Sequence, residues 1–117
     1  LDQKEFDKMN DKVFVAKIHW LSFEQGGRKH GVPLYNDKYC PTVAVDGKHI
    51  FNGSEYGLLC YSYEKIDENI SLAQIRFLNT DAAPDILYIG AKIELYEGNK
   101  KVANGEVFAN SNFKFKF

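Results

Sequence analysis

A glycine pair followed by a cation, Gly26-Gly27-Arg28, is the part of this sequence whose residue types are best suited to binding. Glycine lets the backbone take positive φ or approach a partner closely, and a guanidinium can hold a carboxylate or phosphate through two parallel hydrogen bonds. A partial echo, Gly98-Asn99-Lys100, lies near the other end of the chain. The pattern favours a binding edge over a catalytic centre.

Further cations and an aromatic residue extend this candidate binding surface. If the two glycine-bearing turns lie at the same end of the fold, their cations form one patch, joined by Lys38, that suits phosphate or an acidic protein surface. Tyr is a common interface anchor and also stacks on bases. The candidate binding residues are Gly26, Gly27, Arg28, Lys29, His30, Tyr39, Lys100 and Lys101. The competing interpretation is that this segment is a solvent-exposed loop whose charges contribute only to solubility.

The other residues capable of chemistry do not form a catalytic or metal-binding pattern. The histidines lie far apart, without the spacing of zinc ligands: His19, His30 and His49. Cys60 stands in an apolar stretch, where a thiol is inert, and acidic pairs such as Asp67-Glu68 stand in polar segments. We therefore expect no catalytic residue, no metal and no cofactor.

Composition limits the possible classes of protein. A chain of 117 residues forms one domain, and its single core can be stable without disulfide bonds or a bound metal. The 15% of aromatic residues favours β-sheet. The net charge of −1 gives no overall attraction to nucleic acid or to an anionic membrane. No apolar run approaches the roughly 20 residues that span a bilayer, so we expect no membrane association.

Period-two alternation of apolar residues predicts an all-β fold. Residues 13–20 place Ala16, Ile18 and Trp20 on one face, which predicts that Trp20 lies in the core. Asp46-Gly47 predicts a type I′ turn. The expected strands are 13–20, 39–45, 48–51, 57–63, 72–78, 89–96, 102–109 and 113–117.

The spacing of these strands favours a single small antiparallel β-barrel, since closure removes exposed edges. We expect residues 1–12 to form an N-terminal extension and residues 13–117 the barrel. The polar stretches 24–38, 64–71 and 79–85 are predicted to be loops.

Three stretches, in this order, resemble the C-terminal, third domain of elongation factor Tu: Phe23-Glu24-Gln25-Gly26-Gly27-Arg28, Tyr39-Cys40-Pro41-Thr42-Val43, and residues 93–107. In that family a strand runs into a Glu-Glu-Gly-Gly-Arg loop, a Tyr-Arg-Pro-Gln-Phe strand follows, and a hairpin with a second Gly-Gly-Arg closes the domain. The resemblance implies a barrel of about six antiparallel strands.

In the family this domain packs against a GTPase domain and touches the T stem of aminoacyl-tRNA. The chain departs from the family pattern at Cys40 and Thr42, where the family has Arg and Gln, and at Lys100, where it has Arg. It has no Walker-type phosphate loop, so we expect no GTP binding. The resemblance implies a bacterial, reduced setting and hence a cytoplasmic location.

Three functions follow as hypotheses. The first is a non-catalytic protein-binding module whose partner is a toxin or a translation component, for example an immunity protein that neutralises a toxin. The alternative is an RNA-binding or tRNA-binding domain that uses the basic Gly-Gly-Arg loop. An enzyme with a site assembled from scattered polar residues is the least favoured.

Overall fold

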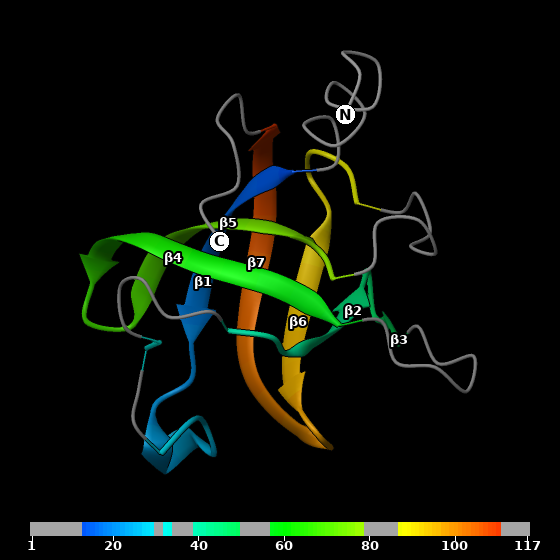
Figure 1. The fold of residues 1–117 in the computed structure, drawn as a ribbon. Helices are drawn as coiled ribbons and strands as arrows, with labels where there is room; N and C mark the ends of the chain where they lie inside the picture. Colours follow the sequence, from blue (N-terminus) through cyan, green and yellow to red (C-terminus); the bar gives the residue numbers. More distant parts are fainter. Residues whose placement is uncertain (1–12, 30–31, 34–38, 50–56, 79–86, 111–117) are drawn as a thin grey trace.

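The fold is a single antiparallel sheet that curls around one core (Figure 1). The computed structural model describes residues 13–29, 32–33, 39–49, 57–78 and 87–110. Within these ranges no helix is long and apolar enough to cross a membrane. The elements are β1 (Phe14–Trp20), a 3₁₀ turn η1 (Phe23–Gln25), β2 (Thr42–Val45), β3 (Lys48–His49), β4 (Leu58–Asp67), β5 (Ile70–Phe77), β6 (Lys92–Glu97) and β7 (Lys100–Asn110).

The first strand lies inside the sheet, between strands from the middle and the end of the chain. The strand order is β3-β2-β6-β7-β1-β5-β4, and each neighbouring pair is antiparallel. The predicted all-β antiparallel fold is therefore confirmed. The hairpin turn at Asp46-Gly47 is also confirmed, because both residues have positive φ, 52° and 79°.

The two sides of the sheet approach each other without forming a continuous ladder. Isolated bridges join Tyr39 to Cys60 and Thr42 to Gly57, so the chain just before β2 meets the start of β4. The N–H groups of Leu58 and Cys60 donate to the carbonyls of Pro41 and Tyr39, both at 2.8 Å. The sheet is not closed, and the word barrel applies to it only loosely.

The predicted loop over residues 64–71 is wrong. Strand β4 continues to Asp67 and β5 begins at Ile70, so only Glu68 and Asn69 turn the chain. Residues 64–67 are exposed, and without a buried face the strand carries no apolar alternation. Their pairing with β5 includes two register shifts, which further obscures the period.

Some expectations fall on parts of the chain outside the described residues. These are the N-terminal extension 1–12, the loop 79–85, the strand 113–117, and the side chains of His30 and Lys38. Strand β6 begins at Lys92 rather than at residue 89, because Gly90 turns the chain with φ of 100°.

The core collects the inward faces of the strands, as the alternation predicts. Trp20 is 3% exposed, which confirms it as a core residue. The fully buried members of the same core come from every long strand and include Ile18, Leu58, Ile75, Ile93, Leu95 and Val107. The core thus supports the end of β1 from which the Gly-Gly-Arg turn leaves the sheet.

Candidate turn surface

The chain leaving β1 folds into a short, well-defined turn instead of an open loop. Ser22 caps η1: the backbone N–H of Gln25 donates to Ser22 Oγ at 3.3 Å, and the Ser22 N–H donates to Gln25 Oε1 at 2.9 Å. This reciprocal capping box satisfies two backbone donors, and Gly26 ends the turn in the left-handed region with φ of 90°. The turn is therefore preorganised.

The second glycine serves close packing within the turn. A Cβ on Gly27 would lie 2.0 Å from the carbonyl oxygen of Leu21, and the Gly27 N–H donates to the Ser22 carbonyl at 2.8 Å. No side chain fits at that distance. Both predicted binding glycines thus have roles in shaping the backbone.

Arg28 connects the turn to the other end of the chain. Its Nε donates to Glu97 Oε2 at 3.1 Å, although 69 positions separate the two residues. The guanidinium carbon also lies 4.6 Å from the centre of the Tyr39 ring. The Gly-Gly-Arg turn and the β6–β7 turn therefore lie at the same end of the sheet, the lower end in Figure 1.

Tyr39 links Arg28 to the core residue Trp20. Its hydroxyl donates to Glu97, and its ring packs edge-on against Trp20, with centroids 5.6 Å apart. Burial raises the pKa of Tyr39, and the hydrogen bond to Glu97 adds to the effect, so the hydroxyl stays protonated. We call Arg28, Tyr39 and Glu97, with Trp20 beneath them, the Arg28 cluster.

Below the Arg28 cluster, the indole of Trp20 is anchored by a buried hydrogen bond. Its Nε1 donates to Ser71 Oγ at 2.9 Å, and the Ser62 hydroxyl lies 3.0 Å from the same oxygen. A buried N–H group needs such an acceptor. The Arg28 cluster is thus fixed from the surface down to β4 and β5.

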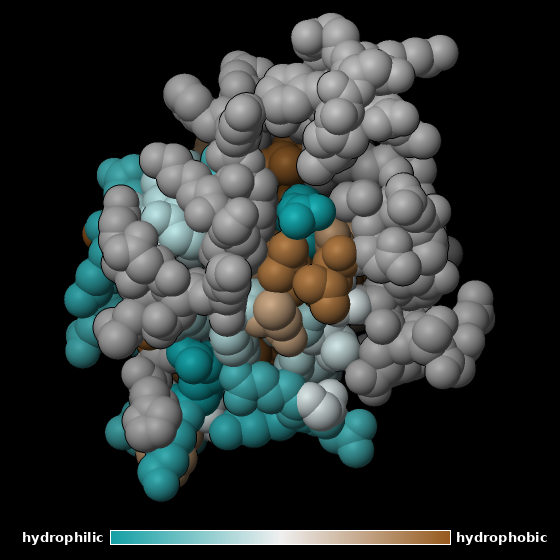
Figure 2. All heavy atoms as spheres, viewed as in Figure 1, coloured by the Kyte–Doolittle hydropathy of each residue, from teal (hydrophilic) through white to brown (hydrophobic). Residues whose placement is uncertain are grey.

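The remaining predicted binding residues are not all engaged in the same way. Lys29 and Lys100 are exposed at the two turns. Lys101 instead pairs with Glu94, with its Nζ 2.9 Å from Glu94 Oε2. Hydrophilic side chains gather at this end of the molecule (Figure 2).

The sequence interpretation missed Phe23 as a candidate binding residue. Its side chain lies in η1 and is 64% exposed, the largest value among the exposed large apolar residues that the structure describes. The Ser22-x-x-Gln25 pattern before the glycine pair is a capping signature that could have predicted the turn. The exposure of the ring follows only from the fold.

The chemistry available elsewhere is limited. Burial raises the pKa of the Cys60 thiol to about 12, which keeps it protonated at neutral pH, whereas Cys40 is exposed. Among the residues with described positions, no three His, Cys, Asp or Glu side chains converge in a way that could hold a metal ion.

Comparison with known proteins leaves the family unassigned. The chain matches no protein-family model, and a search of curated proteins gives no match. The resemblance to the third domain of elongation factor Tu therefore stays a prediction that depends on the quoted motifs. What the fold and the turn define is an all-β domain with a preorganised, aromatic-bearing turn at one end.

Proposed function

We propose that this chain is a non-catalytic protein-binding module that acts through the turn surface, which we define as Phe23, Lys29 and Lys100 around the Arg28 cluster. The observation that carries the proposal is the Phe23 ring, 64% exposed on a turn that a capping box fixes. Large aromatic side chains dominate binding energy at protein interfaces. A turn that is already ordered loses little entropy on binding.

The surroundings of Phe23 indicate the chemistry of the partner. Lys29 and Lys100 are exposed cations on the two turns that the Arg28–Glu97 pair holds together. The complementary surface has an apolar pocket for the ring and acidic groups at its rim. A toxin neutralised by this chain, or a component of the translation machinery, is the kind of partner we propose, in a bacterial cytoplasm.

RNA or tRNA binding through the Gly-Gly-Arg loop is the second candidate. The observation in its favour is the joining of the two cation-bearing turns into one end of the molecule. Two carboxylates weaken it: Glu97 pairs with Arg28, and Glu24 lies exposed in η1. A phosphate backbone carries a charge at every nucleotide and would meet both carboxylates, whereas a protein surface can place its acidic groups opposite Lys29 and Lys100 alone. Protein binding is therefore the better supported function.

The test compares two exposed apolar residues in a capture experiment. Tagged wild-type chain, Phe23→Ser and Leu78→Ser are incubated with lysate of the source organism, with and without nuclease. Leu78 is the matched control, because it is 52% exposed and lies just beyond the end of β5. We expect one protein to be retained by the wild type and by Leu78→Ser but to be lost with Phe23→Ser.

Calorimetry with the purified partner then measures the loss, which we expect to be tenfold or more for a central aromatic anchor. Equal capture by all three chains would refute the turn surface as the binding site. Capture that disappears with nuclease would support RNA binding instead.

A further inference from the structure

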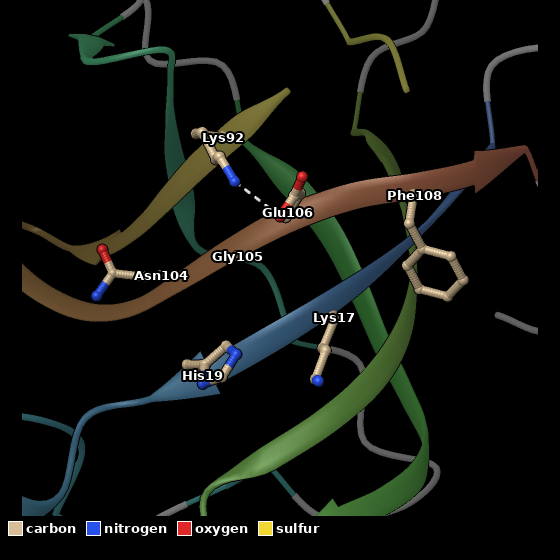
Figure 3. A pocket seen from close by; sticks show the side chains of 7 residues that line it. All are labelled: Lys17, His19, Lys92, Asn104, Gly105, Glu106 and Phe108. Carbon is tan, nitrogen blue, oxygen red and sulfur yellow. Dashed lines mark ion pairs between the residues drawn. The ribbon is translucent and has the colours of Figure 1, made fainter. Parts of the chain in front are cut away.

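A shallow depression lies on the outer face of the sheet, over β1, β7 and the start of β6 (Figure 3). Its volume is about 430 Å³, and it is lined by five polar side chains and one aromatic ring: Lys17, His19, Lys92, Asn104, Glu106 and Phe108. The volume falls within the range of small-molecule sites. None of these residues belongs to the turn surface.

The floor of the depression is the backbone of β7 at Gly105. On the core side of the sheet, a Cβ at this position would lie 2.9 Å from Ile18 Cδ1 and 3.0 Å from Ile93 Cγ1, two buried side chains of the neighbouring strands. Glycine thus lets these side chains close over β7 in the core, while the opposite face of the strand is open to the depression. The flanking side chains of Asn104 and Glu106 stand at the outer surface around the floor.

Polar groups converge on the depression from neighbouring strands. In the antiparallel register, Lys17 lies opposite Glu106 and His19 lies opposite Asn104. Glu106 forms its ion pair with Lys92 on the other side, at 2.7 Å. The Glu106 carboxylate is therefore engaged by Lys92, and an anion in the depression would find the Lys17 ammonium and the His19 imidazole beside this ion pair.

An aromatic ring stands at one end of this polar row. Phe108 is 48% exposed, and in Figure 3 the Lys17 side chain lies between the Phe108 ring and His19. Phe108 follows Glu106 by two positions on β7, so it is a diagonal cross-strand neighbour of Lys17. Such neighbours are about 7–8 Å apart, so the cation and the ring can contact two parts of one ligand. Asn104 adds an amide that can both donate and accept.

We propose that this depression binds a nucleotide unit, with its phosphate at Lys17 and His19 and its base stacked on Phe108. Base stacking on an aromatic side chain combined with a nearby cation is the arrangement by which sheet surfaces hold nucleotides. The carboxylate of Glu106 and the amide of Asn104 provide hydrogen-bond partners for the sugar or the base edge. The nucleotide can be free or part of a single strand.

The test is a titration of the isotope-labelled chain, followed by amide NMR, with three probes: adenosine monophosphate, inorganic phosphate and an eight-residue oligothymidylate. The binding-face variant is Lys17→Gln/Phe108→Ser. The control is Lys65→Gln/Ile66→Ser on β4, which removes one exposed cation and one apolar residue with the same 48% exposure. Thermal melts of both double variants monitor folding.

We expect shifts at the β1 and β7 amides with the mononucleotide, the oligonucleotide or both, and an affinity at least tenfold lower in the binding-face variant only. Binding of the oligonucleotide alone would identify a single strand as the source of the nucleotide, and binding of the mononucleotide alone would identify the free form. Three outcomes would overturn the proposal. Inorganic phosphate could bind as tightly as the nucleotide probes, or the control variant could lose as much nucleotide affinity as the binding-face variant. The third is that neither nucleotide probe, at millimolar concentration, shifts any amide signal.

Discussion

Breaking the Arg28–Glu97 pair should destabilise the protein measurably, even though the pair lies near the surface. The side chains are 21% and 41% exposed, and the Nε–Oε2 distance is 3.1 Å. A partly exposed ion pair with this geometry contributes about 0.5–1 kcal/mol, and the cation over the Tyr39 ring contributes about as much again. Arg28→Ala should therefore lower the free energy of unfolding by about 1–2 kcal/mol.

The assay is a double-mutant cycle with Arg28→Ala, Glu97→Ala and the double variant, each unfolded in urea. We expect a coupling energy of about 0.5–1 kcal/mol, since each single variant removes the same contact. For a domain of this size, the Arg28→Ala loss corresponds to a melting temperature lower by several degrees.

The matched control for this cycle is the Lys92–Glu106 pair, whose side chains are 68% and 51% exposed. Solvent screens that pair more strongly, so its coupling should be smaller although its 2.7 Å distance is shorter. A coupling for Arg28–Glu97 no larger than for Lys92–Glu106 would refute the role assigned to the Arg28 cluster in joining the two turns.

Two further predictions concern the turn and the core. Gly27→Ala should lower the melting temperature more than Gly26→Ala. A Cβ at Gly27 would lie 2.0 Å from the Leu21 carbonyl oxygen, whereas a Cβ at Gly26 contacts no atom and costs only the strain of a positive φ of 90°. Equal losses of melting temperature would contradict this assignment. The free energy of unfolding should fall as the pH rises from about 9 towards 12, because the unfolded chain loses the Cys60 proton first while the folded chain, with the pKa raised to about 12, retains it. In urea titrations across this range, the free energy of unfolding of Cys60→Ala should fall less steeply with pH than that of the wild type. Identical pH dependence of the two proteins would contradict the raised pKa of the buried thiol.

The sequence predicted the fold well where one face of a strand is buried and the other exposed. The alternation along 13–20 placed Trp20 in the core, and Asp46-Gly47 marked its hairpin correctly. The same signal failed at residues 64–67, which are exposed on both faces and held only by pairing with β5. Periodicity reports burial, and it cannot detect a strand that buries neither face.

The candidate site was only partly predictable for a related reason. Arg28 and Tyr39 were identified as binding candidates from residue type, and the prediction that the two turns meet was conditional on the fold. Their contacts with Glu97 and Trp20 join residues far apart in the chain, so no local pattern encodes them. The exposure of Phe23 likewise depends on where the capped turn lies relative to the core.

Because Trp20 packs against Tyr39, its intrinsic fluorescence reports on the state of the Arg28 cluster. The chain has one tryptophan, and its indole touches the Tyr39 ring, which in turn lies beneath the Arg28 guanidinium. Any event that moves the turn, whether it is the docking of a partner or the loss of the Glu97 contact, changes the surroundings of that single fluorophore. Intrinsic emission can therefore follow this end of the molecule in real time, in the unmodified chain and without an attached dye.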